Sequence, residues 1–480
     1  MAPVCDGICS VEKGMPPLSR KDDHMNRKGK KKGSIGVVGA TAIGVGGMMG
    51  AGLYTLIGLA TASAGEWLPV AFIIGGVVAA FSVYSYSKLG VKYPNRGGAA
   101  QFLLECFGDG LIAGGMNVFQ YVGWVIAMAL YATGFSEYAR QLFGLGDSPW
   151  VGRAIGVGII VVMVGVNILG SKLVARAQTA IIAFELVILL AFIVLGLSQA
   201  HVPTISFPGN GGLLGILSAA GLLYVTYEGF GVVANTAGSM KNPSKQLPRA
   251  MYASLAIVMA VYVISSIVVV TTLGVAGAQG AQGHALADAG RIVFGRVGFV
   301  AIGVAALVAT ASAVNSTMFG DTNLAMRVSQ VEEVPRRFGL MTRIGGSWGL
   351  FFTAAITCVF VIVFPLAAVG QMASLAFLLV YGMVSVGHIR VCGKTGARRM
   401  ILVAAIVLNA ALFVLLFSQT VINGSVLTWA SVVGLLVLSF VLEWAWRKRT
   451  HQNRALLGSD PSGDGSNADG DGAPAGTASR

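Results

Sequence analysis

The chain has 480 residues, of which 55% are hydrophobic and 11% are charged, and its mean hydropathy is +0.76. A soluble domain is roughly a quarter charged, so this composition excludes an ordinary soluble protein and indicates a membrane protein. A net charge of +13 would suit a nucleic-acid partner, but the Lys and Arg residues lie in the tails and in loops between apolar runs.

Twelve apolar runs follow one another along the chain. A helix of about 20 such residues crosses a hydrocarbon core roughly 30 Å thick. The runs are predicted as spans at residues 35–60, 67–89, 111–139, 153–171, 177–198, 212–237, 250–274, 297–322, 347–364, 366–389, 400–418 and 425–445. Residues 1–34 are polar and basic without a signal-peptide core, and residues 446–480 are rich in Gly, Ser, Asp and Ala. We expect both tails to be disordered.

The basic residues are distributed unequally between the two sides of the predicted membrane. Four of the 33 Lys and Arg fall in one set of alternate loops, namely Arg140, Arg153, Arg291 and Arg296, and the remaining 29 fall in the tails and in the other loops. Loops rich in Lys and Arg stay in the cytoplasm. We therefore expect a multi-pass protein of the cell membrane with both termini cytoplasmic, in contact with the lipid bilayer and not with nucleic acid.

The first predicted span contains an unusual glycine cluster, 44-GVGGMMGAGLY-54. In one interpretation, Gly46 and Gly50 form a G-x-x-x-G step that lets two helices approach closely. In the other, the helix breaks around Gly50, Ala51 and Gly52, and the broken backbone lines a cavity enclosed by protein. The free amides at the start of the second half-helix would then attract an anion such as a carboxylate.

A second candidate break lies in the sixth predicted span, at 224-YVTYEGFGVV-233, where Gly229 and Gly231 lie beside Glu228. Inverted-repeat transporters place broken helices at corresponding positions of two halves, with the substrate between them. The sequence therefore predicts an all-α membrane protein of 12 transmembrane helices, with broken spans 1 and 6 in a five-plus-five inverted repeat. The repeats are expected at residues 35–198 and 212–390, followed by spans 11 and 12 at residues 400–445.

Two acidic residues, Glu228 and Glu185 in span 5, lie well inside apolar runs. An ionisable residue there costs about 3 kcal/mol on insertion scales, so each is expected either to serve transport or to be a hydrogen-bonded structural carboxyl. Asp321 and Glu443 stand near span ends and are expected at the interface, and His388 is expected at the surface. Three asparagines, Asn167, Asn235 and Asn315, are expected to hydrogen-bond between helices.

Motifs for other chemistry are incomplete. The stretch 387-GHIRVCGKTG-396 has five residues between its first two glycines, where a phosphate loop requires four. No His, Cys, Asp or Glu grouping has the spacing of a metal site, and no nucleophile and base are paired in the sequence. We therefore expect neither a cofactor nor a metal, and no enzymatic activity.

Four stretches carry a resemblance to a known family. They are 44-GVGGMMGAGLY-54, 84-YSYSKLGVKYPNRGGAAQFLLECFG-108, 166-VNILGSKLVARAQTAIIAFE-185 and 227-YEGFGVVANTAGSMKNPSKQLPRAM-251. These stretches are similar to motifs at span 1, after span 2, at the entry to span 5 and at the span 6 break of the amino acid–polyamine–organocation permease superfamily. The resemblance implies the inverted-repeat fold of the leucine transporter and transport of amino acids.

The resemblance also implies a substrate site. In the superfamily, the substrate carboxylate binds amides of the span 1 break, and its amino group meets carbonyls at the span 6 break. The corresponding residues are Gly50, Ala51 and Gly52 in span 1, and Val225, Thr226 and Tyr227, next to Glu228 and Gly229, in span 6.

This sequence departs from the superfamily in three places that bear on ion coupling. Gly231 stands where many relatives carry an acidic residue, and Gly238 and Ser239 replace a frequent acidic pair. Glu185 stands where some relatives carry a Lys thought to stand in for a sodium ion. The expected function is secondary active transport of amino acids by alternating access, with a coupling proton carried by Glu185 or Glu228.

Several alternatives stay open. Coupling to sodium and exchange of one substrate for another are both compatible with the sequence, and so is a non-transporting amino acid sensor. Two membrane carboxylates favour a cationic substrate, such as arginine, lysine or a polyamine, over an acidic one, while a neutral amino acid fits as well. A channel is disfavoured because no span shows a polar stripe.

Overall fold

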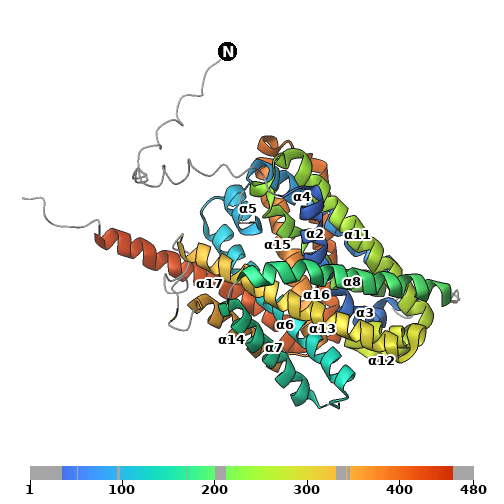
Figure 1. The fold of residues 1–480 in the computed structure, drawn as a ribbon. Coiled ribbons are helices and arrows are strands. Elements are labelled where there is room, and N and C mark those ends of the chain that lie inside the picture. The colour runs from blue at the N-terminus through green and yellow to red at the C-terminus, as the bar shows by residue number, and fades with distance from the viewer. Residues whose placement is uncertain are drawn as a thin grey trace, which may run out of the picture.

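The computed structural model describes residues 35–457, except residues 51, 95–97, 147, 170, 200–211, 331–341 and 343–345. Most of the two expected tails, 1–34 and 458–480, therefore lies outside the described residues. The described part of the chain is helical and has no strand beyond an isolated bridge between Ile35 and Met240 (Figure 1). The all-α prediction is confirmed for this part of the chain.

The helices follow one another with short connections. In chain order they are α2 Val37–Met49, α3 Gly52–Ala64, α4 Leu68–Lys92, α5 Gly98–Phe107, α6 Leu111–Phe143, α7 Pro149–Leu169, α8 Ser171–Gln199, α9 Gly212–Leu223, α10 Phe230–Ala234, α11 Pro243–Thr272, α12 Gly274–Ala281, α13 Ala285–Gln330, α14 Trp348–Val363, α15 Leu366–Thr395, α16 Arg399–Asn423 and α17 Val426–Leu457. The 3-10 turns are η1 Gly65–Trp67, η2 Tyr224–Tyr227, η3 Ala237–Ser239 and η4 Gln282–His284.

Among the described residues, 10 helical segments are long and apolar enough to cross a membrane, which makes the chain a multi-pass integral membrane protein. Three of them each join two helices: Gly52–Lys92 contains α3 and α4, Gly212–Ser239 contains α9 and α10, and Gly274–Met318 contains α12 and part of α13. Two further apolar helices, α2 and α14, are shorter than a full span. The first predicted run, 35–60, is thus divided between two helices.

Some helix boundaries differ from the predicted ones. Helix α13 begins at Ala285, ahead of the predicted start at 297, and its backbone turns at Gly295, where φ is 64°. Only glycine adopts that conformation readily, so the glycine permits the turn. Helix α17 continues to Leu457, past the predicted end at 445 and into the region expected to be a disordered tail (Figure 1).

Helix α5 was not predicted, because it is too short and too polar to appear as an apolar run. It is amphipathic: Phe102, Leu103 and Cys106 are buried, while Gln101 hydrogen-bonds Glu105 on the other side. The buried face packs against α15 and α6. Burial raises the pKa of the Cys106 thiol to about 12, so this cysteine is unreactive near neutral pH.

The long helices pack against partners that are distant in the sequence. Helices α8 and α13 lie side by side across one face of the molecule (Figure 1). Helix α11 packs against α2 and α4, and α15 packs against α6 and α16. As a result, η2, α10 and the C-terminal end of α2 are enclosed by longer helices, which places both interruptions of the helical backbone inside the protein.

The prediction that His388 is a surface residue is wrong. Its side chain is 0% exposed, with Nδ1 2.9 Å from the Ser85 hydroxyl and Nε2 2.8 Å from the Thr395 hydroxyl. The hydrogen bond with Ser85 joins α15 to α4, and the one with Thr395 lies within α15. The predicted span ends at residue 389, but α15 continues to Thr395, almost two turns further, and Thr395 supplies one of the two hydroxyl partners of the imidazole.

The expected interhelical asparagine contacts are confirmed in part. Asn167 of α7 donates a hydrogen bond of 2.8 Å to Oδ1 of Asn315 of α13. By contrast, Asn235 Oδ1 is buried without a hydrogen-bond partner in the described part of the chain. The side chain of Asp321 lies outside the described residues.

Glu443 is buried, contrary to the expectation that it lies at the interface. It is 2% exposed and accepts a hydrogen bond of 2.6 Å from Arg447 Nε one turn later on α17. Arg447 also bonds Asp109, which precedes α6. The Arg447–Asp109 ion pair therefore links α17 to the residues just before α6.

We expect Arg447→Met to lower the stability of the folded protein by about 3 kcal/mol, because it leaves the buried Glu443 without its partner. The fall would be measured as a lower midpoint of thermal unfolding in detergent. Asp109→Asn is the matched control, because Asp109 is 79% exposed and its ion pair is worth at most about 1 kcal/mol. Equal losses in the two variants would contradict this account.

Candidate functional site

The first interruption separates α2 from α3. Helix α2 ends at Met49, Gly50 has φ of −42° and ψ of −76°, and α3 begins at Gly52. Ala51, one of the predicted site residues, lies outside the described residues. The first amides of α3 have no partner within their own helix and carry a positive partial charge. They point at the interruption, where a carboxylate would be stabilised.

The second interruption lies between α9 and α10. Helix α9 ends at Leu223, the chain continues as the 3-10 turn η2, and α10 begins at Phe230. Glu228 and Gly229 stand between η2 and α10. The tighter turn changes the direction of the carbonyl groups, which gives this end of α9 a negative partial charge.

The two interruptions touch each other through glycines. A Cβ atom built on Gly47 would lie 3.2 Å from the Gly229 carbonyl oxygen, and one built on Gly229 would overlap the Gly47 carbonyl group. One turn further along, a Cβ on Gly52 would lie 2.7 Å from Thr226 Cβ. The glycines therefore allow the two backbones to cross in direct contact beside the interruption. Gly46 and Gly50 of the predicted G-x-x-x-G step face other helices, at Ile182 of α8 and Ala313 of α13.

Glu228 is held between two tyrosines from other helices. The Tyr131 hydroxyl of α6 donates a hydrogen bond of 3.2 Å to Oε1, and the Tyr381 hydroxyl of α15 lies 2.9 Å from the Glu228 backbone oxygen and 3.5 Å from Oε2. Glu228 is 2% exposed. No described Lys or Arg lies within ion-pair distance of Glu228. Two neutral hydroxyl groups therefore satisfy the buried carboxyl by hydrogen bonding.

The η2 residues are equally enclosed. Val225 and Thr226 are 2% exposed and Tyr227 is 0% exposed. The Val225 amide donates to the Ser374 hydroxyl over 3.3 Å, and the Tyr227 hydroxyl donates to the Phe72 carbonyl over 2.9 Å. Groups of α15 and α4 thus hold η2 in place, so the backbone carbonyls of η2 keep their direction.

Glu185 lies on a helix that packs against α2, on the side of the first interruption. It is on α8, three residues after Ile182, whose side chain fills the space beside Gly46 of α2. Glu185 is 2% exposed and interacts electrostatically with Tyr54 in the first turn of α3 and with Tyr262 of α11. The structure therefore gives the two predicted carboxylates separate surroundings.

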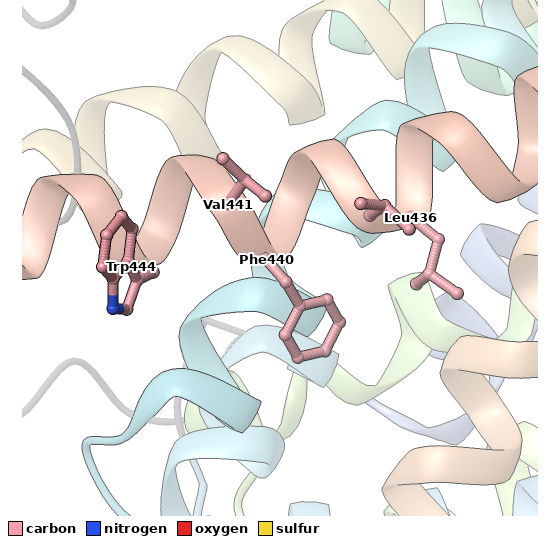
Figure 2. A pocket seen from close by; sticks show the side chains of 5 residues that line it. Leu436, Phe440, Val441 and Trp444 are labelled. Atoms are coloured by element: carbon pink, nitrogen blue, oxygen red, sulfur yellow. The ribbon is translucent and has the colours of Figure 1, made fainter.

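A shallow hollow on α17 is not part of this site. It is lined by Leu436, Val437, Phe440, Val441 and Trp444, which are apolar and come from one helix (Figure 2). A site for a charged or polar molecule needs convergent polar groups, which this hollow does not offer. We interpret it as a part of the lipid-facing surface. Among the described residues, no group of three or more His, Cys, Asp or Glu is arranged to hold a metal ion.

Comparison with known proteins decides the family. Residues 35–454 match the family described as amino acid permease, which covers both interruptions and nearly all described helices. The chain belongs to the amino acid permease family.

Relatives of this permease cover most of its length. An uncharacterised protein of Methanocaldococcus jannaschii is 30% identical over 423 residues, which are 87% of this chain and 97% of the relative. The inner membrane transport protein YbaT of Escherichia coli is 28% identical over 432 residues, 88% of this chain and 99% of YbaT. The serine/threonine exchanger SteT of Bacillus subtilis is 26% identical over 321 residues, 65% of this chain and 71% of SteT. Of these three relatives, two have assigned roles, and they are named a transport protein and an exchanger.

Three tyrosines of the permease site, Tyr131, Tyr262 and Tyr381, were not predicted from the sequence. Each lies in an apolar run of α6, α11 or α15 and brings a hydroxyl to an interruption. A buried Tyr usually finds a hydrogen-bond partner, so a tyrosine in the middle of a span is a usable signal. The signal does not show which neighbour the hydroxyl meets, because spans 3, 7 and 10 are apolar on every side.

Proposed function

We propose that this permease is a secondary active transporter that carries amino acids across the membrane by alternating access. The observation that carries the proposal is the buried meeting of two helix interruptions, at Gly47 with Gly229 and at Gly52 with Thr226. Interrupted helices that meet within a bundle are where inverted-repeat transporters bind substrate. On this proposal, residues 35–198 and 212–390 are inverted repeats within a twelve-span protein whose termini are both cytoplasmic.

The charges of the two interruptions suit the two ends of an amino acid. The substrate carboxylate binds the amides at Gly50, Ala51 and Gly52, at the positive start of α3. The amino group binds the carbonyls of Val225, Thr226 and Tyr227, with Glu228 and Gly229 adjoining them, at the negative end of η2. The burial of the described members of this set supports a site that excludes water around the bound substrate.

Protons are the preferred coupling ion, carried by Glu185 or Glu228. Both side chains are 2% exposed, and a carboxyl in such surroundings can change protonation when a neighbouring charge arrives or leaves. Exchange of one amino acid for another is the second candidate, because the relative SteT is named a serine/threonine exchanger. A sodium ion is the third. A cationic substrate is favoured over an acidic one by the two carboxylates, and a neutral substrate is compatible with the same backbone contacts.

The experiment that tests the proposal is uptake of radiolabelled amino acids and polyamines into proteoliposomes, with and without an inward proton gradient. Accumulation driven by the gradient would support proton symport and name the substrate class. Entry only into preloaded vesicles would establish exchange and contradict symport. No entry of any compound under either condition would contradict transport and leave an amino acid sensor.

We expect Glu185→Gln to lower gradient-driven accumulation at least about tenfold, a loss of roughly 1.4 kcal/mol of coupling, while exchange with preloaded substrate continues. The reason is that an amide keeps the shape of the carboxyl but cannot take up a proton. Glu105→Gln, on the exposed side of α5, is the matched control and should behave as the wild type. Accumulation by Glu185→Gln that still follows the proton gradient would exclude Glu185 as the proton carrier.

A further inference from the structure

Asn409 is a buried polar residue near the middle of α16, a helix that belongs to neither of the proposed repeats. Its neighbours on the same face of the helix, Ala405, Leu412 and Leu416, are apolar and buried. These surroundings alone would suit a leucine, and a polar side chain inside a membrane helix is retained for the hydrogen bonds that it makes. The contacts of Asn409 therefore indicate its role.

The Asn409 amide donates both of its hydrogens. Nδ2 lies 2.8 Å from the carbonyl oxygen of Ala405 on its own helix and 3.1 Å from Oγ of Ser82 on α4. Because a carbonyl oxygen can only accept, the Ala405 contact fixes which atom of the amide is the nitrogen. Oδ1 has no hydrogen-bond partner among the residues that the structure describes. An amide with an unpaired buried oxygen is a costly choice for stability alone.

Ser82 connects Asn409 to the turn η2. Its Oγ lies 2.9 Å from the hydroxyl of Tyr224, the first residue of η2. Tyr227, the last residue of η2, donates a hydrogen bond to the Phe72 carbonyl, which also belongs to α4. Both ends of η2 are therefore held by α4, and the contact at the start of η2 is the one that Asn409 reaches.

Asn409 also borders the second helix that holds the site. A Cβ atom built on Gly382 of α15 would lie 3.6 Å from Asn409 Cβ, so α15 and α16 are in close contact here. Tyr381, the residue before Gly382, donates a hydrogen bond to the Glu228 backbone oxygen. Asn409 thus contacts α4 at Ser82 and α15 beside Tyr381, and these two helices keep the second interruption in place.

We infer that Asn409 is a positioning residue for the substrate amino group and acts from α16 through Ser82 and Tyr224 on η2. The inference rests on the proposed function, in which carbonyls of η2 bind that amino group. With Asn409 as the donor to Ser82, the Ser82 hydrogen is available for the Tyr224 oxygen, and each bond of such a chain strengthens the next. A helix outside both repeats thereby takes part in substrate selection.

The test compares the substrate with its N-methyl derivative. Proteoliposomes take up the radiolabelled amino acid that the wild type transports fastest, and the same unlabelled amino acid and its N-methyl derivative are titrated as competitors. The methyl group alters only the amino end, so the ratio of the two half-inhibiting concentrations reports how closely that end is held. We expect a ratio of about tenfold or more in the wild type and a ratio at least about threefold smaller in Asn409→Leu.

Two further measurements separate this role from a structural one. The midpoint of thermal unfolding of Asn409→Leu should equal or exceed that of the wild type, because leucine leaves no buried oxygen unpaired and Ser82 keeps Tyr224 as a partner. Tyr224→Phe should lower the competitor ratio by a similar factor, and the double variant should lower it no further, because both residues act through one chain of hydrogen bonds.

Thr420→Val is the matched control, because Thr420 is a buried polar residue of α16 whose hydroxyl bonds the Leu416 carbonyl of its own helix. It should keep the wild-type ratio. An unchanged ratio in Asn409→Leu, an equal loss of affinity for both competitors, or additive effects in the double variant would each overturn the inference. So would a wild type that does not distinguish the two competitors. A wild type that takes up no amino acid at all would instead contradict the proposed function itself.

Discussion

Gly229→Ala should lower uptake at least about a hundredfold, since displacing a binding group by about 1 Å can cost that much. The added methyl group would overlap the carbonyl group of Gly47 and approach the Met48 amide. Backbone atoms of a packed helix cannot rotate away as a side chain can, so the two interruptions must move apart. The measurement is initial uptake per amount of folded protein in proteoliposomes.

Gly231→Ala is the matched control for this substitution. It lies two residues further along α10, and a methyl group there would meet the Tyr381 hydroxyl at 3.5 Å and Tyr86 Cε1 at 3.8 Å, which are ordinary contacts. We expect its uptake to stay within about threefold of the wild type, since filling free space without overlap costs little. If Gly229→Ala transported as well as Gly231→Ala, the crossing of the two backbones would not be required for transport.

Glu228→Gln should lower uptake about tenfold or more, because it replaces the carboxyl next to the carbonyls proposed to bind the substrate amino group, and loss of the dependence on the proton gradient would identify Glu228 as the proton carrier. The amide keeps an oxygen that accepts from Tyr131 or Tyr381, so the helices stay in place. What the substitution removes is a carboxyl that can bind and release a proton beside η2. Uptake would be measured across a series of external pH values at a fixed internal pH.

Glu443→Gln provides the comparison for Glu228→Gln. Both glutamates are 2% exposed, but Glu443 pairs with Arg447 on α17 and touches neither interruption. We expect Glu443→Gln to lower thermal stability and to leave the uptake rate per folded protein and its pH dependence unchanged. A similar loss of uptake in both variants would show that burial of a carboxyl, and not its place at the site, is what transport needs.

The sequence predicts the spans and the interruptions for a simple physical reason. A run of about 20 apolar residues has one stable form in lipid, a helix, so span positions follow from composition alone. Glycines at mid-membrane depth then show where that helix can stop, as at Gly50 and Gly229. Exceptions such as α5 and α12 are short helices outside such runs, and composition gives them no comparable signal.

The partners of the site residues could not be predicted in the same way. In a soluble helix the polar face shows which side is outward, but α6, α11 and α15 are apolar on the lipid side and on the protein side alike. Periodicity therefore does not show that Tyr131 and Tyr381 meet at Glu228, or that Tyr262 reaches Met48. His388 and Glu443 were misplaced for a related reason, since nearness to a span end does not reveal which neighbouring helix covers the side chain.

The parallel bridge at the start of α2 has a mechanical consequence. The Ile35 amide donates a hydrogen bond of 3.3 Å to the Ser239 carbonyl, just after α10, and Gly47 meets Gly229 at the other end of the same two helices. Two rods joined at both ends cannot pivot separately. Movement of α2 away from α10 has to break a backbone hydrogen bond. Movement of α2 and α10 together as one rigid body keeps the contacts between them.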